Sequence, residues 1–113
     1  MKRKILGLIE PITVKGKTKE IKVNAKVDTG ASKSSISKEL VKKLGIGKVR
    51  RIAVFKSALG RQKRKVVKTS IVLKGKKLKV FFSVADRKHM KYNLLIGRNI
   101  LRMGKFLIDP LKK

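Results

Sequence analysis

The sequence predicts a single all-β domain over residues 1–113, a closed and mostly antiparallel barrel that carries one or two short helices. Three observations indicate this fold class. Apolar and polar side chains alternate over residues 19–27 and again over 63–73, which is the pattern of half-buried strands. Short Gly-containing turns, at residues 15–17 and 74–76, separate such segments, and many short strands are typical of closed β architectures. Hydrophobic residues make up 42% of the chain but aromatic residues only 4%, so Ile, Leu and Val must build the core.

The first half of the chain is expected to form four strands and one helix. Glu10-Pro11 interrupts the first apolar segment and indicates a kink there. The alternating segment 19–27 delivers Asp28 at its end. Ser37 is a good N-cap for a helix over residues 38–44, which Gly45 ends. The strands predicted in this half cover residues 5–14, 19–27, 34–36 and 50–55.

The second half of the chain is expected to form four more strands and a second helix. Residues 56–62 form the tip of a hairpin, which is by itself an ordinary connection. A polar link over residues 86–90 precedes the last apolar strand, and charge in such a loop is usually solvated. A short helix over residues 98–103 follows Gly97. The strands predicted in this half cover residues 63–73, 78–84, 93–96 and 106–108.

The charge of the chain is extreme. It has 33 Lys and Arg against six Asp and Glu, a formal net charge of +27, and the basic residues are spread along its whole length. Such a field attracts polyanions. Three explanations compete: association with nucleic acid or the ribosome, an acidic substrate, or the lysine-rich bias of a hot or salty cytoplasm. Thermophilic proteins enrich Glu together with Lys, so the scarcity of Glu argues against temperature alone.

Composition also bounds the cofactors and the compartment. The chain has no cysteine and one histidine, His89, which is expected to be a surface residue. Zinc sites usually need three or four His, Cys or carboxylate ligands, so no metal and no other cofactor is predicted. No apolar run approaches the roughly 18 residues of a membrane span. The apolar run 5–9 is too short for the core of a signal peptide. A cytoplasmic location without membrane contact is expected.

Asp28-Thr29-Gly30 is the stretch that suits catalysis. A strand end fixes the direction of the Asp28 carboxylate, and Gly30 allows close approach of the backbone. The Thr29 hydroxyl can donate a hydrogen bond that locks the loop. The alternative interpretation is a β-turn in which the three residues supply only turn chemistry.

Two motifs together carry a resemblance to a known family. Residues 28–31, Asp-Thr-Gly-Ala, and the apolar segment 93–101 with its Gly-Arg-Asn resemble the retropepsin-like aspartic proteases. With Asp86-Arg87 and Asp109-Pro110, the wider match resembles the branch that is often encoded beside a RimK-type glutamate ligase and has been labelled an ATP-dependent zinc protease. The resemblance covers roughly residues 7–110.

The resemblance implies roles for particular residues. It implies that Asp28, Thr29 and Gly30 are catalytic, that residues 95–97 pack beneath the catalytic loop, and that the hairpin tip over 56–62 is a flap that closes over substrate. Asp86-Arg87 is a family signature for which substrate contact and subunit pairing both stay open. The residues implied to bind substrate are Ala31, Ser32, Ser57, Ala58, Leu59, Gly60, Arg61 and Arg87.

The chemistry of this family implies a homodimer. Aspartic proteases use two carboxylates that share one proton, because like charges so close cannot both ionise. The chain has one Asp-Thr-Gly, and neither Asp86 nor Asp109 has the same setting. Asp28 from each of two chains is therefore expected to meet its mate on a two-fold axis, in a C2 dimer.

The chain departs from the retroviral members just after this motif. Ser32 and Lys33 stand where those proteases carry acidic residues, so Arg98 lacks the acidic partner it has there. The basic residues predict an acidic peptide or protein substrate, such as a glutamate-extended tail, because opposite charge raises encounter rates. The cations expected to border the cleft are Lys33, Arg61, Lys63, Arg64 and Arg87.

Two other functions compete with a protease. A basic RNA- or ribosome-binding module on a catalytically silent fold explains the net charge directly, through counterion release. The chain has one Tyr, four Phe and no Trp, so it offers few aromatic side chains on which single-stranded bases can stack. It also contains no recognised nucleic-acid-binding motif, and both observations argue against this function. A silent dimerisation domain is the second rival, against which the intact residues 28–30 argue.

Overall fold

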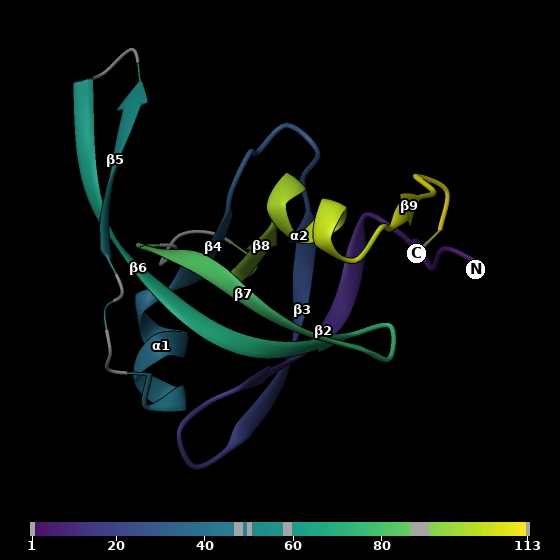
Figure 1. Ribbon diagram of the computed structural model, residues 1–113, viewed down its shortest axis with the longest axis horizontal. Helices are drawn as coiled ribbons and strands as arrows, with labels where there is room; N and C mark the ends of the chain where they lie inside the picture. The colour runs from purple at the N-terminus through teal and green to yellow at the C-terminus, as the bar shows by residue number, and fades with distance from the viewer. Residues whose placement is uncertain (1, 47–48, 50, 58–59, 87–90, 113) are drawn as a thin grey trace.

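A computed structural model describes residues 2–46, 49, 51–57, 60–86 and 91–112 of the chain. Nine strands and two helices are assigned within these residues (Figure 1). In chain order they are β1 (Ile5–Leu6), β2 (Ile9–Lys15), β3 (Glu20–Val27), β4 (Ser34–Ser37), α1 (Lys38–Leu44), β5 (Arg51–Ser57), β6 (Gly60–Leu73), β7 (Lys76–Ala85), β8 (Leu94–Ile96), α2 (Arg98–Met103) and β9 (Leu107–Ile108).

Six strands close into a barrel, in the order β2-β3-β8-β4-β7-β6. The ring closes where β2 pairs with β6, with Thr13 opposite Val72 and Val14 opposite Ile71. Five of the pairings in this sheet are antiparallel and two, β3 with β8 and β4 with β7, are parallel. β5 lies outside the ring and pairs with β6 alone. The predicted fold class, a mostly antiparallel closed barrel with two short helices, is confirmed.

The barrel interior is aliphatic, as the composition predicts. In β3, Ala25 and Val27 are buried while the alternating polar residues Asn24 and Lys26 are exposed, so the alternation over 19–27 marks the inward face. Phe82 on β7 is the largest fully buried side chain. The Ser37 hydroxyl caps α1 by accepting the Leu40 N–H at 3.1 Å. Among the described residues, no helix has the length and apolarity to cross a bilayer.

The kink predicted at Glu10-Pro11 is wrong. The chain breaks instead between Leu6 and Ile9, and Glu10 and Pro11 lie within β2. Glu10 is only 3% exposed, but it accepts the Gly7 N–H at 2.5 Å, so the strand continues through a buried and satisfied carboxylate. Pro11 lies where β2 has β3 as its one neighbouring strand, since β6 joins β2 only further along.

The two ends of the described chain are held together beside the barrel (Figure 1). β1 pairs with β9 in parallel. The Glu10 carboxylate lies 3.4 Å from the Lys74 ammonium and 3.8 Å from that of Lys112, which also donates to the Ile5 carbonyl at 2.9 Å. The neighbouring Lys112 amine and the attraction of Glu10 raise the pKa of Lys74, whereas the neighbouring Lys74 ammonium and desolvation lower the pKa of Lys112. This cluster ties both chain ends to the β6–β7 turn.

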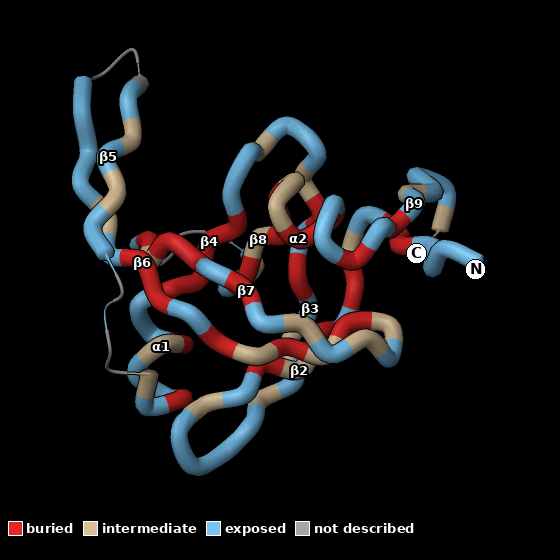
Figure 2. Tube along the Cα trace, viewed as in Figure 1, coloured by how far each residue is buried: buried red, intermediate tan, exposed pale blue. Residues whose placement is uncertain are grey.

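The hairpin of β5 and the first half of β6 projects from the barrel (Figure 1), and most of its described residues are exposed (Figure 2). Ile52 and Val54, on one face of β5, are 63% and 53% exposed. The pairing runs from Arg51 opposite Val66 to Ser57 opposite Gly60, which has φ +119°. The hairpin expected from the sequence is thus present, and its strands extend well beyond the barrel.

Candidate active site

Asp28 is fixed in place by the strand that precedes it. β3 runs parallel to β8, with Val27 beside Ile96, and the Asp28 N–H donates to the Ile96 carbonyl at 2.9 Å. The side chain of Asp28 is half-buried. The position of the Asp28 carboxylate at the end of β3 is therefore fixed by two hydrogen-bonded strands, β3 and β8.

The turn after Asp28 is organised around its carboxylate. The Gly30 N–H donates to Asp28 Oδ1 at 2.9 Å, and the Ala31 N–H donates to the Asp28 carbonyl at 3.3 Å. A Cβ at position 30 would lie 3.2 Å from Oδ1, so glycine lets the backbone come this close. Thr29 and Gly30 are exposed. The sequence left a simple turn and a positioned carboxylate as alternatives. In the structure the hydrogen bond from Gly30 that helps to form the turn also holds the Asp28 carboxylate.

Residues 97 and 98 anchor the Asp28 loop, the name used here for residues 28–33. The Arg98 N–H donates to the Ala31 carbonyl at 2.8 Å. Gly97 packs so closely on the loop that a Cβ there would overlap the Lys33 carbonyl. The Gly-Arg pair of the second motif therefore lies against the loop of the first, as the resemblance implies.

Arg98 has a different partner from the acidic one found in the retroviral proteases. Its Nη1 donates to the Thr29 carbonyl at 2.9 Å. The carbonyl replaces a carboxylate side chain, so the guanidinium still braces the loop. The Thr29 hydroxyl makes no hydrogen bond to any described residue of the same chain, which leaves the Arg98 contact as the polar brace at this residue.

Ser34 is a supporting residue that the sequence interpretation missed. It is fully buried; its hydroxyl donates to Asn99 Oδ1 at 2.6 Å and accepts the Gly97 N–H at 2.8 Å. Asn99 in turn donates through Nδ2 to the Phe81 carbonyl at 3.2 Å. This chain of hydrogen bonds joins β4, α2 and β7 beneath the loop. All four residues of β4 are buried despite three serines, a signal visible only once the strand is placed.

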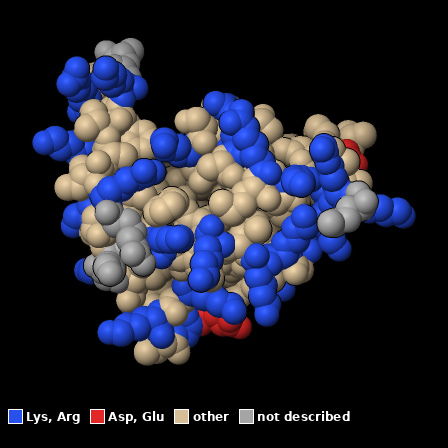
Figure 3. All heavy atoms as spheres, viewed as in Figure 1, with Lys and Arg blue, Asp and Glu red and all other residues tan. Residues whose placement is uncertain are grey.

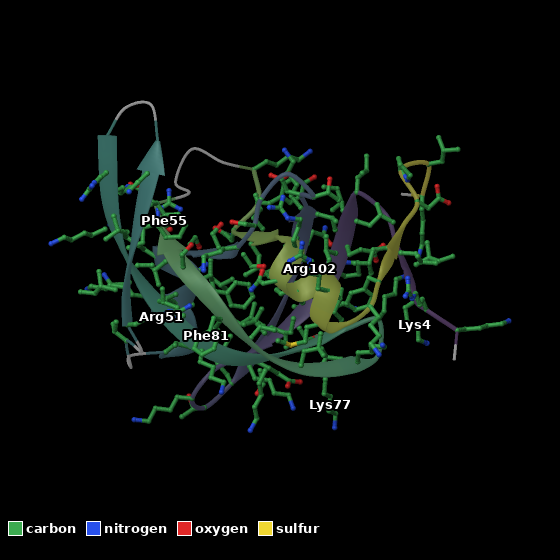
Figure 4. All side chains as sticks on the ribbon, turned by 45° about the horizontal axis from the view of Figure 1, so that its top comes forward. Lys4, Arg51, Phe55, Lys77, Phe81 and Arg102 are labelled. Atoms are coloured by element: carbon green, nitrogen blue, oxygen red, sulfur yellow. The ribbon has the colours of Figure 1, made fainter. Side chains whose placement is uncertain are left out.

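One cavity joins the Asp28 loop to the base of the hairpin. It measures about 240 Å³. Arg51, at the base of β5, lies with its guanidinium 5.3 Å from the Phe81 ring (Figure 4). Two cations, Lys33 and Arg51, thus line one hollow beside the loop, together with serines, Asn99 and apolar side chains. The lining residues are Ser32, Lys33, Ser34, Arg51, Ala53, Val66, Phe81, Ser83 and Asn99.

Of the other residues predicted to bind substrate, those that the structure describes on the hairpin do not line this cavity. Ser57, Gly60 and Arg61 lie at the far end of the hairpin. Ala58, Leu59 and Arg87, like His89, lie outside the described residues. Among the described residues, no three His, Cys, Asp or Glu side chains come together.

Two of the cations expected at the cleft line a different hollow. Lys63 and Arg64 border a cavity of about 630 Å³ between the hairpin and α1, where Lys38 and Lys42 also lie. The positive charge therefore extends around the base of the hairpin as well as beside the Asp28 loop.

Comparison with solved structures shows a shared fold. The structure superposes on Lpg0085 of Legionella pneumophila, a protein of unknown function, with a TM-score of 0.68 and 20% identity over 99% of this chain and 97% of that one. It superposes on the retroviral protease-like domain of Ddi1 from Leishmania major with a TM-score of 0.65 and 25% identity, over 87% of this chain and 77% of that one. For the EIAV protease bound to an inhibitor, the TM-score is 0.63 and the identity 20%, over 84% of this chain and 85% of that one. No protein of curated function matches the sequence.

A family model gives the narrower result. The model described as retropepsin-like aspartic endopeptidase RimB matches residues 42–113, well over half of the chain. The matched segment begins after the Asp28 loop and includes β8 and α2, which hold that loop from below. By this match and by its retropepsin-like barrel, the chain belongs to the RimB-like family of retropepsin-like aspartic endopeptidases.

Proposed function

We propose that this protein is an aspartic endopeptidase that works as a homodimer, with Asp28 of each subunit as the catalytic carboxylate. One observation carries the proposal. Asp28 stands at the end of a barrel strand, hydrogen-bonded through Oδ1 to Gly30 and braced by Arg98 through Thr29, in a chain of the RimB-like family. A carboxylate held in this way is oriented before substrate arrives.

The chemistry requires a second carboxylate beside the first. Two Asp28 side chains that share one proton divide the roles, since the ionised one takes a proton from water and the protonated one polarises the peptide carbonyl. Attack of the water forms a tetrahedral intermediate, and a proton passed to the leaving nitrogen completes the cleavage. A single chain contributes one such loop, so a C2 dimer supplies the pair.

The surface around the loop supports pairing. Thr29 and Gly30 are exposed in the single chain, and the β1–β9 ribbon and α2 present apolar side chains to solvent. Exposed apolar groups that cluster in this way mark interaction surfaces. The exposed apolar residues of these segments are Ile5, Met103 and Leu107, and Leu8 and Leu111 lie close to them in the sequence.

The substrate proposed is an acidic peptide, such as a glutamate-rich protein tail. The cavity of about 240 Å³ beside the Asp28 loop carries Lys33 and Arg51 among serines and an asparagine, groups that suit a carboxylate side chain. Lys and Arg are spread across the face seen in Figure 3, with few Asp or Glu among them. Such a surface draws acidic chains toward the site.

A second candidate, an RNA- or ribosome-binding module without catalysis, is favoured by one observation, the net charge of +27. It predicts tight RNA binding whose logarithm falls linearly with the logarithm of salt concentration. The two functions are compatible, because a protease that acts on ribosome-associated tails also benefits from a basic surface.

The test is cleavage of a peptide library by the wild type and by Asp28→Asn, with the mass in solution recorded for both. We expect Asp28→Asn to remain dimeric and to lose cleavage by at least about 10³-fold. Glu20→Gln, a matched loss of one exposed carboxylate at the start of β3, should keep full activity. Glutamate-rich peptides should be cleaved faster than neutral ones. No cleavage by the wild type, with tight salt-sensitive RNA binding, would favour the binding module.

A further inference from the structure

A third cavity, of about 450 Å³, adjoins the Asp28 loop on the side away from the hairpin base and is lined by four cations. Arg3 precedes β1, Arg98 and Arg102 belong to α2, and Lys105 lies in the turn that follows. No acidic side chain lines it among the described residues. The other lining residues are Thr29, Leu101, Phe106 and Ile108.

The walls of this cavity are built by well-packed segments. Leu101 and Phe106 are buried and form its apolar floor. The Phe106 N–H donates to the Leu101 carbonyl at 3.1 Å, and the Lys105 N–H donates to the Arg102 carbonyl at 3.1 Å, so the turn after α2 is closed by its own backbone. Arg102 extends from α2 (Figure 4). The four cations are therefore displayed around a fixed hollow.

The cavity lies where its positive charge should affect the association of the two subunits. Thr29 lines it and directly follows Asp28. In the proposed dimer the two Asp28 carboxylates lie about 3 Å apart, so the two cavities come close to the two-fold axis. Eight cations then lie near one interface, where like charges repel each other. Unless an anion is bound there, this charge opposes the dimer.

We propose that this cavity is an oxyanion site, filled by phosphate or a similarly multivalent oxyanion, and that its occupancy favours the dimer. Planar guanidinium groups match the oxygen spacing of phosphate and bind it with charge-assisted hydrogen bonds. Three arginines around one hollow supply more donors than a single phosphate accepts. The inference rests on the proposed homodimer and adds a ligand class to it.

The experiment measures the dimer dissociation constant of the full chain by sedimentation, in sodium phosphate and in sodium chloride of equal ionic strength. Phosphate should tighten the dimer by about tenfold, a typical coupling between two sites. The double variant Arg3→Gln and Arg102→Gln should lose that difference. Lys22→Gln with Lys79→Gln, two exposed strand cations away from the cavity, makes the same change in net charge and should keep it. Circular dichroism checks the fold of both.

Three results would overturn the site. The first is equal dissociation constants in phosphate and chloride. The second is a control pair that loses the phosphate response as fully as the cavity pair, since that marks an effect of total charge. The third is a wild type that dimerises tightly in chloride and is weakened by Asp109→Asn, because carboxylates next to Ile108 would then neutralise the partner's cations.

The same samples separate this inference from the protease itself. Phosphate-dependent pairing without cleavage that depends on Asp28 would keep the oxyanion site and remove the enzyme. Cleavage that depends on Asp28, with equal pairing in both salts, would keep the enzyme and remove the site. A chain that stays monomeric under every condition would remove the site together with the homodimer.

Discussion

The Asp28 loop and the β5–β6 hairpin are both connections between two strands, but they are held in opposite ways. The loop donates a hydrogen bond to the Ile96 carbonyl and accepts two from Arg98, residues far away in the sequence. The hairpin pairs with itself from residue 51 to residue 66, and two of its apolar residues, Ile52 and Val54, remain largely exposed. Figure 2 shows the same contrast as buried strands beneath the loop and an exposed hairpin.

This difference indicates that the Asp28 loop is the more rigid of the two segments and the hairpin the less rigid one. Groups that do chemistry lose rate when they move by an ångström, so a fixed loop suits the Asp28 carboxylate. Segments with few buried contacts open at low free energy, and lids are drawn from such segments. The hairpin has this character, which supports its proposed role as a flap. Changes in the loop should therefore cost global stability, whereas changes in the hairpin should alter local opening.

Gly97→Ala is expected to have the largest effect. The backbone at Gly97 has φ −95°, which any residue adopts, so the cost is steric: the new Cβ overlaps the Lys33 carbonyl and forces the loop away. We expect a loss of about 3 kcal/mol in the free energy of unfolding and loss of cleavage. Urea denaturation and the peptide assay measure the two.

Gly60→Ala is the matched control in the hairpin. It has the opposite problem, a φ of +119° with open space around it, so the cost is strain alone. Because the end of the hairpin can open locally, the free energy of unfolding should fall by less than about 1 kcal/mol. Equal losses for the two variants would remove the contrast between loop and hairpin.

The regular parts of the fold were predictable because their signals are local. The alternation over residues 19–27 marks one buried face, and a strand that ends at Asp28 follows from it. Ser37 and Gly45 bound α1 through capping chemistry that a few residues determine. The Gly97-Arg98 motif was found through its resemblance to a family, since nothing local in it points to a loop 64 or more residues earlier in the chain.

The supporting network was not predictable, because it depends on partners that only the closed barrel brings together. Glu10 looks like a strand breaker until Gly7, Lys74 and Lys112 surround it. Ser34 starts a strand that the sequence predicts, but a hydroxyl side chain gives no local sign that it is fully buried. In both cases a polar residue is inside because tertiary contacts satisfy it.

Ser34→Ala tests that network and should have an intermediate effect. The change leaves the Gly97 N–H and Asn99 Oδ1 without their buried partner. We expect the free energy of unfolding to fall by about 2 kcal/mol, measured by urea denaturation. Ser32→Ala, the same change at an exposed position of the loop, should stay within about 0.5 kcal/mol of wild type. A cost at Ser34 no larger than at Ser32 would mean that the network does not support the loop.

The smallest effect is expected at Arg64, and it should appear only in the hairpin. The Arg64 guanidinium lies 4.8 Å from the centre of the Phe55 ring (Phe55 is labelled in Figure 4). It also donates a hydrogen bond to Gln62 Oε1 at 3.0 Å. The contact with Phe55 ties a side chain of β5 to one of β6 beyond the barrel. Arg64→Ala should leave the free energy of unfolding within about 0.5 kcal/mol of wild type. Amide exchange over residues 51–57 should become about two- to fivefold faster, the factor that a surface cation–π contact of about 0.5–1 kcal/mol supplies.

Lys65→Ala is the control on the same strand, because Lys65 is exposed and lies on the other face of the hairpin, opposite Ile52. Its amide exchange over residues 51–57 should match wild type. If Lys65→Ala speeds exchange as much as Arg64→Ala does, total charge and not the Phe55 contact governs opening. If neither variant changes exchange, the backbone pairing of β5 with β6 alone holds the hairpin. A positive result would mean that opening of the hairpin can be adjusted without loosening the Asp28 loop.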